Sequence, residues 1–293
     1  MKKAVVIGGS GFLGSHVADA LTAKKFDVWI YDQIESPYVQ KNQKFILGDI
    51  SDVEKLALAV DGADVVLNYA AVADIQSASQ SPMLSCQVNI VGNLNALEAC
   101  RTKGVKRFVL ASTVYVNSSE GQLYKCTKQA AESYVREYSK IYDLDFTILR
   151  YGSLYGLRAD KTNGIRKIVE HALKTKAIKY IGHPDSLRQY VHVIDAAFAT
   201  VDLLQEQGKN RTFVITGNET YAVRDVLHLL AEILDYPVES VEFEKANQNG
   251  HYIRTPYNYD SHHCRKYFTN TQVEFGQGIL EIIDYLSNQE NTD

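Results

Sequence analysis

The first half of the chain alternates between short apolar stretches and amphipathic helical patterns, and this alternation restricts the fold more than any other feature. The stretches with the composition of buried strands are KAVVIG, DVWIYD, KFILGD, DVVLNYA, RFVLAST and DFTILRY. Helical patterns separate them over Phe12 to Lys24, from Ser51 onward, over Pro82 to Thr102 and over about Leu123 to Tyr142. Strands with little alternation that are separated by helices form parallel sheets covered on both faces. The sequence therefore predicts an α/β fold with a doubly wound parallel sheet.

The regular alternation ends after Arg150. The segments YGSLYGLRADKTNG and IGHPDSLRQ are rich in turn-forming residues, and shorter helical patterns follow. We expect residues 1–150 to form the sheet domain, rejoined by about 188–208. Residues 151–187 and 209–293 are expected to form a smaller α/β domain over the C-terminal ends of the strands, where open α/β sheets bind ligands.

Composition excludes several classes of protein. The 293 residues are enough for one large domain or two closely joined ones. A formal net charge of -4 argues against nucleic acid as a partner. No apolar run is long enough to span a bilayer, and the scattered cysteines form no C-x-x-C pair. We therefore expect a cytoplasmic protein with reduced thiols and with no membrane or nucleic-acid partner.

The stretch VVIGGSGFLGSHVADAL joins the first strand to the first helix through a glycine-rich turn. Gly8, Gly11 and Gly14 have the spacing G-x-x-G-x-x-G, and Gly9, Gly11 and Gly14 also satisfy G-x-G-x-x-G. Glycines let the backbone turn tightly and approach a phosphate, and the helix N-terminus offers N–H groups and a positive dipole end. Because the motif follows a strand and opens a helix, it predicts the pyrophosphate site of a Rossmann-type domain.

Two acidic residues follow at strand ends, Asp32 after the second strand and Asp49 after the third. A carboxylate at the end of the second strand accepts hydrogen bonds from the adenosine ribose hydroxyls and would repel a 2′-phosphate. Gln33 and Ile34 follow it, rather than Arg or Lys. We therefore predict NAD rather than NADP. Asp49 either contacts the adenine or stabilises its own loop.

Tyr124 and Lys128 stand four residues apart on one helix, directly after the fifth strand and its Ala111-Ser112-Thr113 end. A phenol has an unperturbed pKa of about 10. A nearby ammonium and the charge of an oxidised nicotinamide stabilise the phenolate and would lower that pKa, which suits acid–base catalysis. With 19 tyrosines in the chain, a chance Y-x-x-x-K is expected, so the evidence is the position. A hydroxyl, a phenol and an amine are predicted to converge at a hydride-transfer centre.

As a set, these motifs resemble those of the extended short-chain dehydrogenase/reductases, specifically the NAD-dependent nucleotide-sugar epimerase/dehydratase family. The resemblance covers nearly the whole chain and includes GGSGFLG, GDI, NYAA (where H-x-A-A is usual), VNIVGNLNALEAC, AST-VY, YKCTK, LRYGSLYG and RQYVHVIDAA. It implies that Tyr124 is the acid or base, that Lys128 holds the nicotinamide ribose and that Ser112 or Thr113 is the hydroxyl partner. The residues that it places along NAD are Gly8, Gly11, Phe12, Leu13, Gly14, Asp32, Asp49, Ile50, Tyr69, Ala70, Ala71, Lys128 and Tyr151, the last as a packing residue.

The resemblance also implies that the second domain binds a nucleoside-diphospho sugar. Arg188, in RQYVHV, matches a position where relatives contact the substrate diphosphate, and a planar guanidinium suits that contact. Arg254 and Asn163 are further candidates for substrate binding. His262 and His263 are sequence neighbours without a carboxylate cluster, so we predict no metal site.

The chain departs from the family pattern directly after the expected hydroxyl. Dehydrating relatives usually carry an Asp-Glu pair after the catalytic Thr, and decarboxylating relatives carry a Glu there. Here Val114 and Tyr115 follow Thr113, which argues against both reactions. Strand register favours Thr113 over Ala111 as the hydroxyl position. Ser153 stands where many relatives have a substrate-binding Asn.

These observations predict a nucleotide-sugar 4-epimerase, with Tyr124 as the base and NAD as the hydride acceptor. A 4-dehydrogenase that releases a 4-keto sugar, as in GDP-heptose oxidation, and a reductase of a non-sugar ketone remain alternatives. A nicotinamide-sensing regulator fits less well, because such proteins typically lose the Tyr/Lys pair. Relatives commonly form a homodimer through the helices after strands four and five, and Ile90, Leu94, Leu97 and Arg101 follow helical spacing there.

Overall fold

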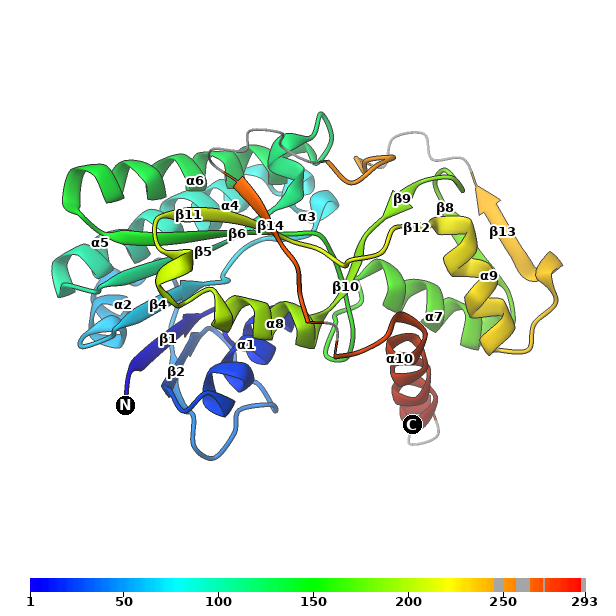
Figure 1. Ribbon diagram of the computed structural model, residues 1–293, viewed down its shortest axis with the longest axis horizontal. Coiled ribbons are helices and arrows are strands. Elements are labelled where there is room, and N and C mark those ends of the chain that lie inside the picture. The colour runs from blue at the N-terminus through cyan, green and yellow to red at the C-terminus, as the bar shows by residue number, and fades with distance from the viewer. Residues whose placement is uncertain (245–249, 257–263, 271, 291–293) are drawn as a thin grey trace.

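Figure 1 shows the computed structural model, which describes residues 1–244, 250–256, 264–270 and 272–290. Within these residues, eight parallel strands form one sheet in the order β14-β11-β6-β5-β4-β1-β2-β3. The predicted doubly wound parallel sheet is thereby confirmed. The strands are β1 (Lys3–Ile7), β2 (Asp27–Asp32), β3 (Lys44–Leu47), β4 (Val65–Asn68), β5 (Arg107–Thr113), β6 (Asp145–Tyr151), β11 (Arg211–Ile215) and β14 (Cys264–Tyr267).

Two apolar cores cover the two faces of this sheet. Ala4 and Val6 of β1 pack on one face, against α1 (Phe12–Ala23) and α8 (Val193–Asp202). Val5 and Ile7 pack on the other, against α2 (Val53–Val60), α5 (Asn93–Lys103) and α6 (Gln122–Tyr142). Side chains alternate along a strand, so an unbroken apolar run such as AVVI supplies both cores at once. Because the strands are parallel, the C-terminal ends of β1, β2, β4 and β5 meet at one edge.

The helix predicted over Pro82 to Thr102 is one continuous rod with a change of winding in its middle. It comprises α4 (Pro82–Cys86), the π-helical segment η1 (Gln87–Gly92) and α5, and it follows the short α3 (Ile75–Gln80). π-Helical turns are frequent at functional sites. Here the turn carries Asn89, whose Nδ2 donates to Thr127 Oγ1 on α6 and to Val72 O. The rod is thereby joined to the helix that carries Tyr124 and Lys128.

A smaller unit lies beside the sheet (Figure 1) and has its own apolar core, built mainly from three helices. These are α7 (Gly164–Thr175), α9 (Val223–Ile233) and α10 (Phe275–Glu290). Short strand pairs accompany them: β7 (Ser153–Tyr155) with β10 (Tyr190–His192), β8 (Ile178–Ile181) with β13 (Val241–Glu244), and β9 (Leu187–Arg188) with β12 (Tyr221–Ala222). Short 3₁₀ turns complete the described chain: η2 (Val114–Asn117), η3 (Glu206–Gly208) and η4 (Val238–Ser240).

One predicted boundary is wrong. Residues 209–293 were assigned to the smaller domain, but β11 and β14 extend the main sheet beyond β6. α8 packs against α1, and the chain then continues into β11. The part of the chain that returns to the sheet domain therefore extends past residue 208. Phe213 and Ile215 of β11 are buried in the sheet core. A strand of this length carries too weak a pattern to be assigned to one of two sheets from sequence. In the described part of the chain, no helix combines the length and apolar character of a membrane span.

Candidate active site

The glycine turn lies at the C-terminal edge of the sheet, between β1 and α1. Gly8 has a φ of +76°, and a Cβ there would lie 2.4 Å from Ala70 N. A Cβ on Gly14 would lie 2.2 Å from Gly8 O. Gly11, by contrast, would bring its Cβ no closer than 3.4 Å to any atom. Packing within the protein thus requires Gly8 and Gly14, whereas the bare Gly11 leaves space beside the N-terminus of α1 into which a ligand phosphate fits.

Two adjoining cavities, of about 550 and 600 Å³, meet at this turn and share Gly8, Gly11, Tyr69 and Ala71. The first extends to Asp32 and is also lined by Ile50 and Ala70. The second extends past Phe12, Leu13 and Gly14 to Ser112, Thr113, Tyr124, Lys128 and Tyr151. An elongated site with a phosphate-binding turn at its centre fits a dinucleotide. Its two ends are the predicted ribose-binding carboxylate and the predicted catalytic group.

The two acidic residues have different surroundings. Asp32 lines the first cavity, and its Oδ2 accepts a hydrogen bond from Ser10 N at 2.9 Å, which fixes the carboxylate against the glycine turn. The Asp49 carboxylate accepts hydrogen bonds from Ser51 N and from Gln33 Nε2, both at 2.7 Å. Asp49 is not among the residues that line the cavity in the described part of the chain. Its side chain therefore stabilises its own loop, the second of the two predicted roles.

The catalytic candidates come together at the end of β5 and the start of α6. Thr113 hydrogen-bonds with the Tyr124 hydroxyl. The Lys128 ammonium donates to Ala111 O at 2.9 Å, and its Nζ lies 5.9 Å from the centre of the Tyr124 ring. Ser112 Oγ instead donates to Glu132 Oε1 at 2.6 Å, inside the protein. The geometry therefore favours Thr113 over Ser112 as the hydroxyl partner of the phenol.

Both ionisable groups of the pair are buried, and burial changes their pKa values in opposite directions. It raises the pKa of the Tyr124 phenol well above its ordinary value, and the hydrogen bond with Thr113 only partly opposes this. It lowers the pKa of the Lys128 ammonium to about 8, with the charge of Glu132 acting in the other direction. The expected lowering of the Tyr124 pKa is thus not found in the protein alone, because burial of the phenol disfavours its charged form.

A buried network of charged side chains connects β5, β6 and α6 next to the catalytic candidates. Arg150 binds Glu132 with two hydrogen bonds, from Nε at 2.8 Å and from Nη2 at 2.6 Å. Arg136 Nη2 adds a third, at 2.7 Å. Bidentate pairs of this kind are directional as well as strong. Glu132 also accepts the hydrogen bond from Ser112 Oγ. The network therefore fixes the end of β5 against α6, and with it the position of Thr113.

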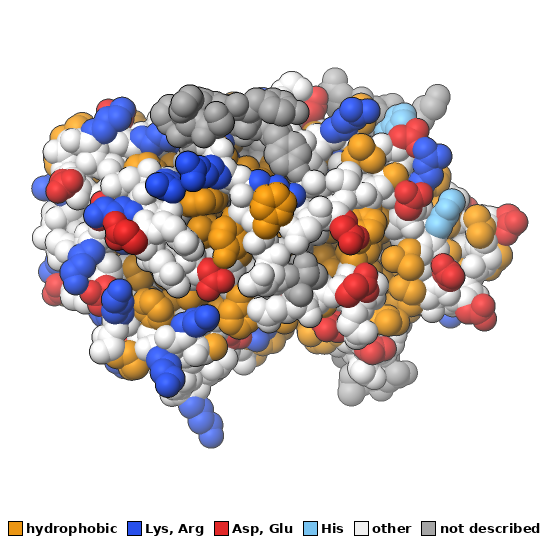
Figure 2. Space-filling view, viewed as in Figure 1, with side chains coloured by type: hydrophobic (Ala, Val, Ile, Leu, Met, Phe, Trp, Pro, Cys, Tyr) orange, Lys and Arg blue, Asp and Glu red, His pale blue; other side chains and the backbone are white. Residues whose placement is uncertain are grey.

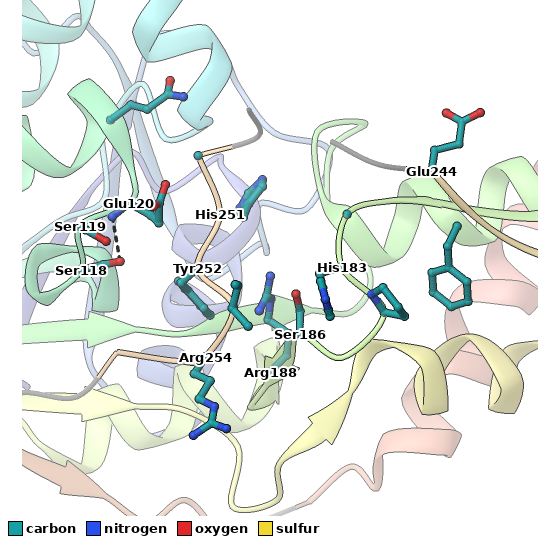
Figure 3. Close-up of a pocket in the computed structure, with 16 residues that line it drawn as sticks. Ser118, Ser119, Glu120, His183, Ser186, Arg188, Glu244, His251, Tyr252 and Arg254 are labelled. Carbon is teal, nitrogen blue, oxygen red and sulfur yellow. Dashed lines mark hydrogen bonds between the residues drawn. The ribbon is translucent and has the colours of Figure 1, made fainter. Parts of the chain in front are cut away.

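A third cavity, of about 1170 Å³, adjoins the catalytic one and shares His251 with it. Its lining includes both predicted arginines, Arg188 and Arg254. The Arg188 guanidinium is buried and lies 4.5 Å from the centre of the Tyr252 ring. In Figure 3 the side chain of Arg254 points away from Ser186 and His251. The arginines thus line one cavity without converging on a single point.

The third substrate candidate also has a structural role. Asn163 lines the catalytic cavity, but it is the N-cap of α7: its Oδ1 accepts from Arg166 N at 3.2 Å, and its Nδ2 donates to Leu154 O at 2.9 Å. The amide is therefore used to hold the protein together. His262 and His263 lie outside the described residues. Among the described residues, no cluster of three or more His, Cys, Asp or Glu side chains could hold a metal ion.

A family model for the NAD dependent epimerase/dehydratase family matches residues 4–216 of the chain. The chain belongs to this family. The predicted family, its enzymatic character and NAD as the cofactor are thereby confirmed. Because the family includes epimerases and dehydratases, membership alone leaves the reaction open.

Individual members of the epimerase/dehydratase family match over most of the chain. The UDP-glucose 4-epimerase of Corynebacterium glutamicum is 26% identical over 80% of this chain and 82% of that protein. The UDP-glucose 4-epimerase of Thermotoga maritima, solved with UDP-glucose, superposes with a TM-score of 0.85 at 25% identity, covering 98% of this chain and 99% of that one. The Thermus thermophilus UDP-glucose 4-epimerase, solved with NAD, gives a TM-score of 0.81 at 26% identity, covering 97% and 99%.

The site of this chain also has a feature that the sequence patterns did not indicate. The segment 250–254 crosses between the two units and separates the catalytic cavity from the outer one. Its His251 Nδ1 lies 2.7 Å from Tyr115 Oη, and the Tyr252 ring lies 4.9 Å from the Tyr115 ring. Figure 3 shows His251 and Tyr252 between the Ser118–Glu120 turn and His183. Tyr115, which lines the catalytic cavity, thus contacts a segment that lines the outer one, and a contact spanning 136 positions leaves no local sequence signal.

Proposed function

We propose that the protein is an NAD-dependent 4-epimerase of a nucleoside-diphospho sugar. The observation that carries this proposal is the continuous row of three cavities. Asp32 marks one end, the Thr113–Tyr124 pair lies in the middle, and the cavity with Arg188 and Arg254 forms the other end. A cofactor on one side of the pair and a diphosphate on the other would meet at Tyr124. The names of the matched relatives, UDP-glucose 4-epimerases, support the same reaction.

In this proposal Tyr124 accepts the proton of the sugar C4 hydroxyl while Thr113 orients that hydroxyl. NAD, when bound, would supply the acceptor, and then the donor, of the C4 hydride. The Lys128 Nζ lies beside the Tyr124 ring. Its positive charge stabilises the phenolate form of Tyr124. Acid–base assistance of this kind accounts for roughly 10²–10⁴-fold in rate. Inversion at C4 then requires the keto sugar to turn over beside Tyr124, in the catalytic cavity of about 600 Å³.

The carboxylates near Tyr124 do not favour an elimination. Val114, where dehydrating relatives begin their acidic pair, is buried, and the Tyr115 hydroxyl is bonded to His251. Asp74 and Asp160 line the catalytic cavity, but each has an oxygen committed to its own turn. Asp74 Oδ1 accepts from Ser77 N, and Asp160 Oδ1 from Thr162 N. A dehydratase would need a carboxyl group free to act as acid.

Product analysis tests the reaction directly. The purified enzyme with NAD is incubated with UDP-glucose, UDP-N-acetylglucosamine or a GDP-sugar, and the products are followed by NMR. We expect an equilibrium mixture of C4 epimers with no net NADH. A 4-keto product with stoichiometric NADH would replace this proposal by a 4-dehydrogenase. Activity only with NADPH and a non-sugar ketone would overturn both.

We also propose that two copies of the chain associate through the face formed by α4, η1, α5 and α6. Apolar side chains are exposed there, with Leu84 51%, Val91 47% and Tyr134 44% accessible. Patches of exposed apolar side chains commonly mark interfaces. Figure 2 shows one face of the molecule, with more Lys and Arg side chains over the sheet domain and more Asp and Glu side chains over the smaller unit.

A further inference from the structure

The loop that follows Asp32 forms the outer wall of the cofactor cavity. Gln33, Ile34, Glu35, Ser36, Pro37 and Tyr38 all line the cavity together with Asp32 and Gly11. The outer part of this loop has little apolar anchoring, since Ile34 is 73% exposed. Gln33 is bonded to Asp49 at the start of the loop, and Tyr38 and the residues after it hold the loop at its other end.

Tyr38 is held by side chains from two distant parts of the chain. The Arg158 guanidinium, from the connection between β7 and α7, lies 4.4 Å from the centre of the Tyr38 ring. The hydroxyl of Tyr285, on the last helix α10, lies close enough to the Tyr38 hydroxyl to interact with it and contributes to raising the pKa of Tyr38. A guanidinium over a tyrosine ring contributes about 0.5–2 kcal/mol, depending on how far the pair is removed from water. Both partners belong to the part of the chain that follows β6.

Arg158 forms an ion pair with Asp19 of α1, a helix that packs on the main sheet. Arg158 Nη2 lies 2.8 Å from Asp19 Oδ2, and both side chains are about four-fifths buried, with exposures of 21% and 22%. Asp19 Oδ1 accepts further hydrogen bonds from Gln40 Nε2 at 2.8 Å and Gln43 Nε2 at 3.0 Å, at the far end of the same loop. One carboxylate thus joins the loop, the arginine and the first helix.

The backbone at Arg158 has an unusual conformation that its contacts hold in place. Its φ is +64°, in the left-handed region that a non-glycine residue adopts at a cost. Such a conformation persists where surrounding contacts fix it. Next to it, Leu157 O is held by His16 Nε2 of α1 at 3.1 Å. The contacts therefore place the guanidinium over Tyr38 at the expense of local backbone strain.

We propose that Tyr38, Arg158 and Tyr285 form a latch that holds the loop over the adenosine end of the cofactor site and slows the release of NAD. To open the loop, the ring of Tyr38 must leave the guanidinium and the Tyr285 hydroxyl together. The importance of the latch for turnover rests on the proposed function, because an epimerase returns the same hydride and gains by keeping its cofactor, whereas a dehydrogenase must exchange it.

The test measures cofactor release without any sugar. The holoenzyme is loaded with NADH, excess NAD is added, and the loss of bound NADH fluorescence gives the dissociation rate. We expect Arg158→Ala to release NADH about tenfold faster, equivalent to about 1.4 kcal/mol. Tyr285→Phe should accelerate release by a smaller factor. Tyr38→Leu, which removes the ring, should match Arg158→Ala, and it provides the test if that variant does not fold.

Lys176→Ala is the matched control. Lys176 also has a positive φ, of +59°, and its Nζ also lies over a tyrosine ring, Tyr236, at 5.4 Å, but within the smaller unit. Equal release rates for wild type, Arg158→Ala and Tyr38→Leu would overturn the latch and leave the epimerase proposal intact. Conversely, a failure to epimerise any sugar would not alter these rates, so the two proposals fail separately.

Discussion

At the scale of single residues, the active site depends on which hydroxyl and which cation face the Tyr124 phenol. Thr113 faces it, whereas Ser112 faces the buried Glu132. Lys128 is bonded to the Ala111 carbonyl and is held in an apolar environment. The chemistry of the pair is therefore determined by orientation and desolvation, which can be tested separately.

The two hydroxyls should respond differently to removal. We expect Thr113→Val to lower kcat about 100-fold, since it removes the hydroxyl beside the reacting oxygen, and to cost some stability, since Thr113 Oγ1 also accepts a hydrogen bond from Tyr115 N at 3.3 Å. Ser112→Ala should leave kcat within a few-fold but reduce the free energy of unfolding by about 1–3 kcal/mol, because Glu132 loses a buried partner. Steady-state kinetics and denaturant unfolding of both variants measure this. The reverse pattern would make Ser112 the hydroxyl partner.

Lys128 should make stability depend on pH. In the folded protein its pKa is about 8, against an ordinary 10.5, so above pH 8 the folded chain loses this proton before the unfolded chain does. Stability rises with pH where the unfolded state binds more protons, so the penalty of burying the ammonium, complete below pH 8, is relieved between pH 8 and 10.5.

The comparison is between cofactor-free wild type and Lys128→Met from pH 7 to 10, by denaturant unfolding. We expect wild type to gain stability relative to the variant as pH rises through 8. The raised pKa of Tyr124 acts in the opposite direction only above about pH 10, where unfolded tyrosines ionise, so that range is avoided. A difference that stays constant with pH would show that Lys128 is not desolvated.

At the scale of elements, the site is assembled by connections rather than by the strands alone. The segment 250–254 is bonded to both units: Gly250 O accepts from Gly121 N at 2.9 Å, and Ile253 O accepts from Leu187 N at 2.7 Å. It places His251 and Tyr252 between the catalytic and outer cavities. Its position therefore affects how a substrate in the outer cavity reaches the catalytic one.

Gly250→Ala should disturb this segment specifically. Gly250 has a φ of +66°, and a Cβ there would lie 2.9 Å from Gln122 Nε2. We expect the KM for the sugar nucleotide to rise about tenfold while NADH affinity stays unchanged. Gly62→Ala is the control: Gly62 has a φ of +69°, and its Cβ would meet nothing within 4 Å, so it adds only the backbone cost of about 1 kcal/mol. An equal change in KM for both variants would contradict the role of the segment.

At the scale of the whole molecule, the proposed dimer can be tested by its exposed apolar face. We expect light scattering to give twice the chain mass for wild type and a shift toward the monomer for the double variant Val91→Asp, Tyr134→Asp. Val238→Asp is the control, because Val238 is exposed (61%) but lies in the smaller unit. A monomeric wild type would reject the proposal, and a double variant that stays dimeric would place the interface elsewhere.

The local sequence determined the features that depend on short stretches of chain. The unbroken apolar runs specified parallel strands with two buried faces, and the glycine spacing with Asp32 predicted the cavity in which we expect the adenosine end of the cofactor. Tyr124, Lys128 and Thr113 were predictable because they lie at a strand end and in the first turns of the next helix, where parallel topology fixes their position.

Tertiary structure decided everything that depends on contacts between distant residues. The assignment of β11 and β14 to the main sheet depends on which partner is nearby, which short strands do not encode. Asn163 became a helix cap, and Tyr115 met His251 across 136 positions. The raised pKa of Tyr124 was also unpredictable, because desolvation is a property of the folded surroundings and not of the spacing between a tyrosine and a lysine.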